Sequence, residues 1–328
     1  MDQDDRRPPA RVTAFRQVLP NAPPAHPTPR RFGLTLLAAA LSTLTGCQQY
    51  NLLDAKGPVA AAEANILVVA TIIMLAIIVP TMIATVVFAW WYRASNTRAR
   101  YRPDWAFSGR IELVVWSVPL LTIIFLGGIA WIGSHQLDPA VPIASERKTL
   151  EVQVVSLDWK WLFIYPEQGV ASVNELVVPA STPVRFSLTS ASVWNAFFVP
   201  QLGSMIYTMR GMVSRLHLMA DRETELRGLS AHFSGDGFAD MHFPVRSVSD
   251  AGFAEWVGSV RRAAPTLDGA SYAELAKQSI ADAPRRFGTV DPSLFDGIVA
   301  QTVPAGPGPT EHGVKGVRPK PGPRPGGT

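Results

Sequence analysis

Methionines and histidines are the residues of this chain whose types and spacing best suit metal binding. Met205, Met209 and Met212 lie close together, and His217 and His242 follow them. Thioether and imidazole groups are ligands for copper(I), so one interpretation is a soft metal site. Methionine also commonly fills gaps in hydrophobic cores. We therefore predict that the methionines pack within the fold and that the two histidines lie on its surface.

The acidic residues suggest no pair for acid–base catalysis. Asp158 and Glu167 are isolated from other candidate groups. Glu112 stands at the start of an apolar segment, where a carboxylate favours a helix N-terminus, although a proton path is an alternative. No Ser/His/Asp triad, phosphate loop or zinc spacing stands out. The sequence thus predicts no catalytic residue in this chain.

Composition narrows the classes of function further. The chain has 328 residues and one cysteine, Cys47, which excludes a disulfide framework and any site needing two thiolates from this chain. The net charge is +4 and the isoelectric point about 9.4. The basic residues gather in the leader, in one loop and in the tail rather than on one patterned face. We therefore expect no nucleic-acid partner.

Two uncharged apolar segments are the most prominent feature of the first half of the chain. Ile66–Trp91 and Leu113–Gly133 contain no charged residue, and roughly 20 apolar residues suffice for a helix to cross a bilayer. Trp90, Trp91 and Tyr92 end the first segment, as interfacial anchors do. We predict transmembrane helices over about 66–91 and 112–133. The alternative is a buried hairpin in a soluble protein.

The loop between the two segments sets the orientation. Short arginine-rich loops remain in the cytoplasm, so both flanks of the hairpin are expected on the outer side of the membrane. Asp104 is the only acidic residue among the basic residues of this loop, which are Arg93, Arg98, Arg100, Arg102 and Arg110.

The N-terminal region has the pattern of a lipoprotein signal peptide. Residues 1–46 contain a polar leader, a pair of arginines and the short apolar run Phe32–Leu44. Leu44-Thr45-Gly46-Cys47 then matches the bacterial lipobox, which predicts lipidation of Cys47 after cleavage. The alternative is a buried cysteine at the end of a third helix. The predicted membrane part is therefore 47–134, a lipidated N-terminus and the hairpin.

Alternating apolar and polar residues predict strands beyond the hairpin. Leu150–Val154, Val184–Leu188 and Arg215–Leu218 all alternate, with proline and glycine turn signals between them. Repeated short strands favour a Greek-key β-sandwich, predicted over 145–249.

A helical extension is predicted to follow the sandwich over 250–300. Asp250–Arg261 places its apolar residues on one face, with Asp250 as the expected N-cap. Ser271–Ile280 is a weaker helical pattern. The segment 301–328 is rich in proline and glycine, which predicts a disordered tail.

Five stretches of the chain together resemble a known family. They are Trp91–Asn96 (WYRASN), Val115–Pro119 (VWSVP), Asp158–Trp161 (DWKW), Phe197–Ser204 (FFVPQLGS) and Ser234–Phe238 (SGDGF). With the lipobox and the hairpin, they are similar to subunit II of the haem-copper terminal oxidases, especially the quinol oxidase branch. The resemblance covers roughly residues 47–300, and it implies a cupredoxin-like sandwich in a multi-subunit respiratory complex.

In the cytochrome c oxidase branch of this family, the sandwich holds a two-copper centre, copper A, in a loop of the form C-x-E-x-C-x-x-x-H-x-x-M. Laid on Ser230–Met241 (SAHFSGDGFADM), the loop keeps one ligand, Met241. The two cysteines, the glutamate, the loop histidine and an upstream histidine are replaced, in that order, by Ser230, Ser234, His232, Phe238 and Asn195. A serine hydroxyl does not replace a thiolate, so the resemblance implies no metal in this chain.

Two tryptophans need a different role if copper is absent. In copper-bearing relatives, the aromatic residues at the positions of Trp159 and Trp161 lie near the electron path. We predict that here they pack between the sandwich and subunit I of the complex.

The resemblance implies a complex that takes electrons from membrane-dissolved quinol. This chain would be the non-catalytic subunit II of a proton-pumping ubiquinol oxidase, with a structural and assembly role. The haems and one copper are expected in subunit I, which reduces oxygen to water and meets the ubiquinol. Expected partners are subunit I, the other small membrane subunits and the bilayer, without cytochrome c. The implied location is a bacterial inner membrane, with the lipidated N-terminus and the sandwich in the periplasm.

Two other functions remain as alternatives. One is the copper-A electron-entry subunit of a cytochrome c oxidase, against which the missing thiolates argue. The other is a free-standing, membrane-anchored, cupredoxin-like lipoprotein that acts as a binding or assembly factor.

Overall fold

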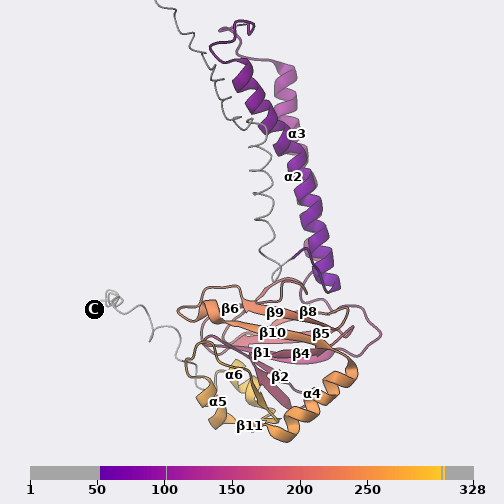
Figure 1. The fold of residues 1–328 in the computed structure, drawn as a ribbon, viewed down its shortest axis with the longest axis vertical. Coiled ribbons are helices and arrows are strands. Elements are labelled where there is room, and N and C mark those ends of the chain that lie inside the picture. Colours follow the sequence, from indigo (N-terminus) through magenta and orange to yellow (C-terminus); the bar gives the residue numbers. More distant parts are fainter. Residues whose placement is uncertain (1–51, 101, 304–305, 307–328) are drawn as a thin grey trace, which may run out of the picture. The chain divides into compact units, whose positions relative to one another are not determined.

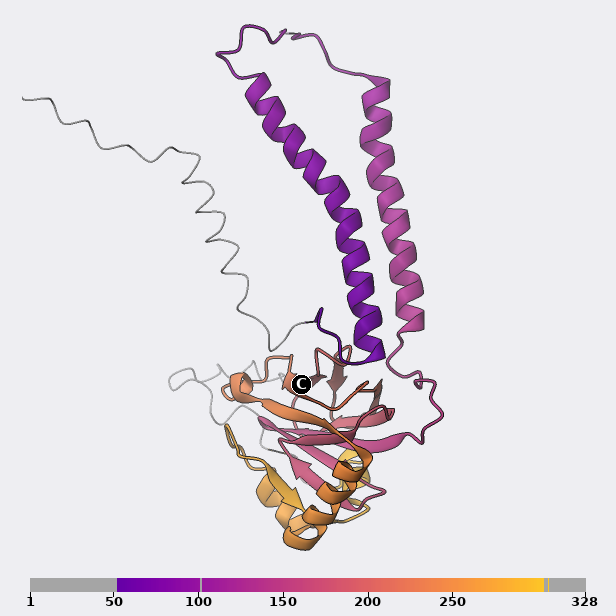
Figure 2. The same ribbon diagram turned by 45° about the vertical axis from the view of Figure 1, so that its right-hand side comes forward.

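Two long apolar helices begin the part of the chain that this computed structural model describes, residues 52–100, 102–303 and 306. All of these residues lie in one compact unit, Gln49–Thr328. Helix α2 spans Pro58–Trp91 and helix α3 spans Gly109–Gln136 (Figures 1 and 2). Both are long and apolar enough to cross a membrane, and apolar side chains are exposed along both. The predicted pair of apolar helices is therefore confirmed, and it indicates membrane anchoring.

The bounds of these helices differ from the predicted ones. Helix α2 begins at Pro58 rather than near residue 66, because proline suits the first turn of a helix and the segment before the apolar run continues the helix. Ala60 in this early turn is fully buried, and its N–H donates to the carbonyl of Leu202 (3.2 Å). Helix α3 likewise passes both predicted ends, 112 and 133. Hydropathy marked the apolar part of each helix, and for α2 the predicted end at Trp91 is correct.

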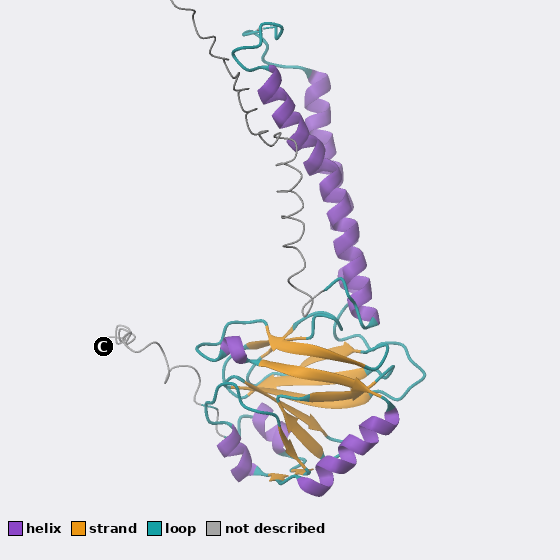
Figure 3. Cartoon of the chain, viewed as in Figure 1, coloured by secondary structure: helices purple, strands orange, loops and turns teal. Residues whose placement is uncertain are grey.

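The strands that follow form a sandwich of two sheets (Figure 3). The six-stranded sheet has the order β12-β3-β2-β1-β5-β8, the five-stranded sheet has the order β4-β10-β9-β6-β7, and β11 pairs with β13 separately. The strands are β1 (Leu150–Leu157), β2 (Lys160–Tyr165), β3 (Val170–Val173), β4 (Leu176–Pro179), β5 (Val184–Ser190), β6 (Asn195–Phe198), β7 (Ile206–Thr208), β8 (Ser214–Leu218), β9 (Thr224–Ser230), β10 (His242–Val248), β11 (Thr266–Leu267), β12 (Arg285–Phe287) and β13 (Thr289–Val290).

Each of the two sheets contains one parallel pair among antiparallel ones. Strand β1 runs parallel to β5, and β4 runs parallel to β10, while the neighbouring pairs are antiparallel. The alternation predicted for Leu150–Val154 is present, with buried residues at every second position. A β-rich sandwich after two helices is thus confirmed, although it is a mixed and not a purely antiparallel one.

Aromatic rings fill the space between the two sheets. The rings of Trp161 and Phe197 lie 5.5 Å apart, those of Phe163 and Phe243 lie 5.0 Å apart, and Phe197 stacks on Phe243 at 5.6 Å. Large buried rings contribute much of the hydrophobic stabilisation of a small sandwich. Trp161 is completely buried in this core, so the prediction that it packs against a partner subunit was wrong.

The C-terminal extension packs in two places: its later helices cover one face of the six-stranded sheet, whereas its first helix packs Trp256, Val257 and Val260 against the core between the sheets. It contains helices α4 (Asp250–Ala263), α5 (Gly269–Leu275) and α6 (Leu294–Val299). A second core forms where Leu162 and Val173 of the sheet meet side chains such as Phe295. Strand β2 is consequently buried along its whole length, because it has apolar partners on both faces.

Three predictions about this extension were wrong in detail. It is not wholly helical, because β12 pairs with β3 and extends the sheet. The N-cap of α4 is Ser249, whose side chain accepts from the N–H of Gly252 (3.1 Å), rather than Asp250. Helix α5 ends at Leu275, short of the predicted end at Ile280. The predicted leader, Cys47 and most of the predicted tail lie outside the described residues.

A buried lysine joins the sandwich to its extension. Lys160 Nζ donates to the carbonyl of Lys277 (2.5 Å) and to Ser279 Oγ (2.5 Å), and it lies 3.9 Å from the carboxylate of Asp282. Burial lowers the pKa of Lys160, and the Asp282 carboxylate partly opposes this shift. A buried ammonium needs such partners, so the β1–β2 turn and the segment 277–282 hold each other in place.

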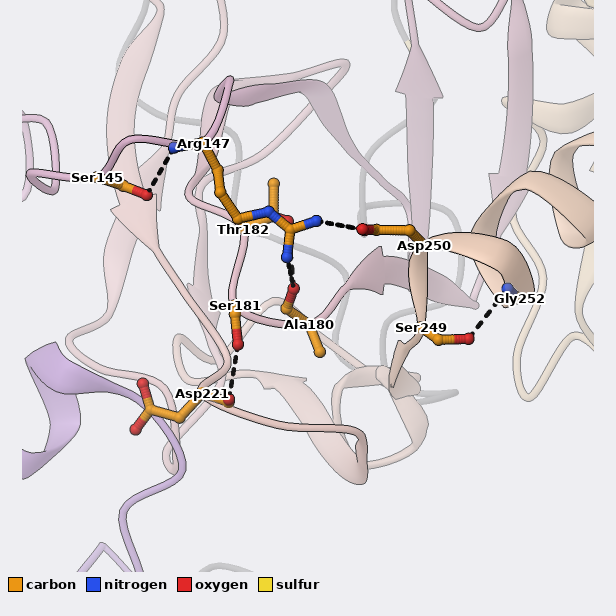
Figure 4. Close-up of polar contacts among 9 residues, drawn as sticks. All are labelled: Ser145, Arg147, Ala180, Ser181, Thr182, Asp221, Ser249, Asp250 and Gly252. Carbon is orange, nitrogen blue, oxygen red and sulfur yellow. Dashed lines mark hydrogen bonds and ion pairs between the residues drawn. The ribbon is translucent and has the colours of Figure 1, made fainter.

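The linker after α3 is fixed to the sandwich by Arg147 (Figure 4). Its Nη1 donates to the carbonyl of Ala180 (3.0 Å), and its Nη2 donates to the Asp250 carboxylate (2.5 Å) at the start of α4. Nearby, Ser181 Oγ donates to the carbonyl of Asp221 (2.8 Å). One guanidinium therefore ties the linker to both the sheet and the extension, although an exposed ion pair of this kind contributes only about 0–1 kcal/mol.

We predict that the second core contributes strongly to the stability of the outer domain. Phe295→Ala should lower the free energy of unfolding by about 3–5 kcal/mol, because it opens a cavity between the extension and the sheet. Urea unfolding of the full chain in detergent, followed by tryptophan fluorescence, measures this change. Phe233→Ala is the matched control, because Phe233 is 75% exposed and its loss should cost no more than about 1 kcal/mol. Equal effects of the two changes would show that the extension is not part of the core.

Candidate functional site

The candidate site lies where β9 ends and β10 begins, in the loop Ser230–Met241. Strands β6 and β9 bring Phe197 opposite Ser230. The N–H of Ser230 donates to the carbonyl of Met241 (2.9 Å), which closes the base of the loop. A 3-10 helix, η3 (Phe238–Asp240), forms the return of the loop. We call this segment the degenerate loop, because it has the length of the copper-binding pattern described above but keeps only one of its ligands, Met241.

Two predicted ligand positions are joined by a hydrogen bond. Ser230 Oγ donates to Asn195 Oδ1 (2.9 Å), and both side chains are almost completely buried. Thr208 Oγ1 donates to the carbonyl of Asn195 (3.3 Å) and lies 2.8 Å from Ser156 Oγ. Buried polar groups are stable when they satisfy one another, so hydroxyls and an amide form a small internal network here.

A tryptophan supports the middle of the degenerate loop. Trp159 stands in the two-residue turn between β1 and β2 with a positive φ of 63°, and its Nε1 donates to the carbonyl of Ser234 (3.1 Å). A Cβ on Gly237 would lie 2.5 Å from Cγ of Trp159, so only glycine fits against the indole. Trp159 is therefore a support within this chain and not, as predicted, a packing group for subunit I.

The remaining side chains of the loop have separate surroundings. Met241 is buried in the aromatic core, whereas His232 is half-exposed and its ring meets Tyr207 edge-on at 5.6 Å. Phe238 packs against Phe233 at 5.6 Å. Ser234 Oγ is buried and has no hydrogen-bond partner among the described residues. The structure thus brings Asn195, Ser230 and Met241 to one end of the sandwich.

The donor set does not fit a pair of copper ions. A copper pair of this kind is bridged by soft thiolate ligands, and the two positions that correspond to cysteines carry neutral hydroxyl groups. The Ser230 hydroxyl is already used by Asn195, and the phenyl ring of Phe238 offers no donor atom. The geometry of the loop depends instead on hydrogen bonds and on packing against Trp159.

The methionine–histidine group from the sequence is not a site. Met205 and Met212 are about half exposed, so the prediction that they pack in the core was wrong. His217 is buried with its Nδ1 3.2 Å from the carbonyl of Pro139, so it is not a surface histidine either. Over residues 52–100 and 102–303, no group of three or more His, Cys, Asp or Glu side chains has metal-binding geometry.

The acidic residues flagged in the sequence are also far from forming a pair. Asp158 and Glu167 lie at opposite ends of β2, and Asp158 accepts a short hydrogen bond from Ser192 Oγ. Glu167 binds Lys148 (2.9 Å) on the surface. Glu112 accepts from Trp116 Nε1 (3.0 Å) one helical turn away, in agreement with a simple helix-terminal role.

A contact that the sequence did not predict joins the start of α2 to the loop after β6. The N–H of Lys56 donates to the carbonyl of Gln201 (2.8 Å), and Glu63 of α2 accepts from Ser204 Oγ. The Cβ of any residue replacing Gly57 would lie 2.1 Å from the carbonyl oxygen of Met219. The charged residues Lys56 and Glu63 before the apolar run were the only signal of this contact, because a charged side chain is costly inside a membrane span.

These features define a class: a β-sandwich that follows a helical hairpin, with a loop between β9 and β10 that contains no thiolate. The family described as COX Aromatic Rich Motif matches residues 261–306, which cover most of the C-terminal extension. The chain belongs to the ubiquinol oxidase subunit 2 family, as its relatives show.

Two curated relatives establish this membership. Cytochrome bo(3) ubiquinol oxidase subunit 2 of Pseudomonas aeruginosa is 48% identical over 82% of this chain and 81% of its own. Ubiquinol oxidase subunit 2 of Acetobacter aceti is 46% identical over 81% of this chain and 86% of its own. Among solved structures, the periplasmic domain of subunit II of the cytochrome oxidase of Bradyrhizobium japonicum is 28% identical and covers 34% of this chain and 91% of that chain, with a TM-score of 0.32.

We predict that the contact between Gly237 and Trp159 holds the degenerate loop. Gly237→Ala should reduce the free energy of unfolding by about 1–3 kcal/mol, because the added methyl group overlaps the indole. Gly269→Ala is a matched control, because nothing lies within 4 Å of a Cβ built there. Thermal unfolding of both variants beside the wild type tests the prediction. A Gly237→Ala protein as stable as the control would contradict it.

Proposed function

We propose that this chain is a non-catalytic subunit 2 of a proton-pumping ubiquinol oxidase and acts in assembly and support. The observation that carries the proposal is the donor set of the degenerate loop. In a chain of this family, hydroxyl groups stand where an electron-entry site would need thiolates, and Ser230 is already hydrogen-bonded to Asn195. Without such a site, the outer domain has no means to receive electrons from a soluble carrier.

Electrons therefore take a route that does not pass through this chain. Ubiquinol is dissolved in the bilayer and meets the haem-bearing partner subunit there. The haems and one copper of that partner supply the chemistry that reduces oxygen to water. The residues of this chain hold no reacting atom, and their contribution is to anchor, to cover and to position.

The two helices supply the membrane anchor and the surface for partner helices. Their apolar side chains are exposed around α2 and α3, so in the complex they face lipid or the helices of other subunits. The arginine-rich loop between them is proposed to lie in the cytoplasm of a bacterial cell. The sandwich then lies in the periplasm, and lipidation of Cys47 adds a second anchor on that side of the inner membrane.

Hydrogen bonds at the base of α2 would let the first helix support the sandwich. The backbone of Lys56 and Ala60 binds the loop that carries Gln201 and Leu202, so the first helix enters the membrane directly from the sandwich. This loop follows β6, which also carries Asn195 of the candidate site. A subunit docked on α2 would therefore bind a helix whose base is hydrogen-bonded to the loop after β6.

Donor preference and copper content test this proposal. The purified complex should consume oxygen with ubiquinol and show no stimulation by reduced cytochrome c, because this chain has no metal entry port. Copper per haem, measured by elemental analysis, should equal the content of the haem subunit alone. An infrared absorption band from a copper pair, or oxygen uptake driven by cytochrome c, would contradict the proposal. Deleting the gene and still obtaining an assembled, quinol-oxidising complex would refute the assembly role.

We also predict that removing the two remaining side chains of the loop that could bind copper leaves the copper content of the complex unchanged. His232→Ala and Met241→Leu should leave copper per haem and ubiquinol oxidation unchanged in the assembled complex, because neither side chain binds copper there. Leucine keeps the buried volume of Met241, so stability should fall by less than about 1.5 kcal/mol. A loss of copper in either variant, with normal assembly, would reveal an electron-carrying site in this chain.

A further inference from the structure

The loop that joins α2 to α3 carries an unusual concentration of exposed positive charge. Its five arginines, which we call the arginine surface, are all exposed. The loop contains one acidic residue, Asp104, so residues 92–110 have a net charge of +4. The arginine surface consists of Arg93, Arg98, Arg100, Arg102 and Arg110.

Within the described residues, no carboxylate neutralises the arginine surface. The recorded ion pairs all lie in the segment before α2 or in the outer domain. Arg93 makes other contacts: its guanidinium lies 4.9 Å from the centre of the Trp90 ring and donates to Trp90 O (3.0 Å) and to Ser95 Oγ (3.0 Å). The positive charge of Arg93 is thus held at the end of α2 without a carboxylate partner among the described residues.

Exposed aromatic side chains accompany the arginines. Trp90 and Trp91 end α2, and Trp105 and Phe107 precede α3, with Phe107 71% exposed. Tryptophan concentrates where hydrocarbon meets headgroups, because its ring is apolar and its N–H is polar. Because α2 ends and α3 begins at this loop, the aromatic residues and the arginines lie at the same end of the helical hairpin, where the two helices would leave the membrane.

We propose that the arginine surface binds the phosphate headgroups of anionic phospholipids in the adjoining leaflet. Guanidinium groups form paired hydrogen bonds with phosphate oxygens, and the aromatic side chains fit the region just below the headgroups. An acidic protein surface would match the charge but would leave Trp105 and Phe107 without an apolar environment. An anionic lipid satisfies both kinds of side chain at once.

This inference does not depend on the proposed oxidase function. It needs only that α2 and α3 cross a membrane, so a chain with another activity would keep the lipid site. It also assigns the loop more than a topological role, because an orientation signal requires positive charge but no bound lipid.

Lipid retention by the assembled complex tests the proposal. Wild type and the variant Arg98→Gln/Arg100→Gln/Arg102→Gln are reconstituted in nanodiscs of phosphatidylcholine and phosphatidylglycerol in equal amounts. After gentle re-extraction, mass spectrometry measures the phosphatidylglycerol retained per complex. We expect the apparent affinity for it to fall about fivefold for each arginine removed, and to fall with added salt. Arg215→Gln/Arg222→Gln/Arg262→Gln changes the same charge in the outer domain and should retain the wild-type amount.

A second variant guards against a change of orientation in the first. Trp105→Ala/Phe107→Ala keeps every arginine, and it should also lower phosphatidylglycerol retention because the apolar contacts are lost. Protease digestion of the outer domain on spheroplasts checks the orientation of each variant. Wild-type retention in both variants would overturn the proposal. Loss of partner subunits with unchanged lipid retention would also overturn it and would identify an acidic protein surface as the occupant.

Discussion

Burial of the β1–β2 ladder on both faces is the constraint on which the rest of the outer domain depends. One face meets the aromatic core that contains Trp161, and the other meets the C-terminal extension through Leu162. Two-sided burial removes more apolar area from water than a simple sandwich does, and it fixes the short turn at Asp158 and Trp159. Lys160, immediately after this turn, is held by backbone and side-chain oxygens of the extension.

The β1–β2 turn supports the degenerate loop, so the extension that holds Lys160 also supports the candidate site. Trp159 projects from the turn and binds the carbonyl of Ser234, and Gly237 passes close over its ring. A metal centre normally holds its own loop in shape through strong ligand bonds. Here an indole, a glycine and the Asn195–Ser230 hydrogen bond do so, which explains how the loop keeps a defined shape without metal ligands.

The membrane part and the outer domain meet through backbone hydrogen bonds and through apolar contacts of the first turn of α2, where Val59 lies against Gly203 and Ala60 is buried. Lys56 and Ala60 add their N–H groups to the loop after β6, and α2 continues from there without a break. Hydrogen bonds from a continuous helix transmit orientation better than a flexible linker would, while Arg147 fixes the second connection after α3. The apolar faces of both helices consequently remain available for lipid and for partner subunits.

The sequence by itself determined the two apolar helices and the strands with alternating residues, because each depends on local composition or spacing. The replaced ligand positions came from the resemblance to a known family and not from composition. The tertiary structure alone decided that α2 begins at Pro58, that β12 joins a sheet, and that Trp159 and Trp161 are buried inside this chain. It also placed His217 inside and Met205 outside, against the prediction. Each of these outcomes depends on contacts between segments far apart in the chain, and hydropathy or periodicity within one segment contains no information about such contacts.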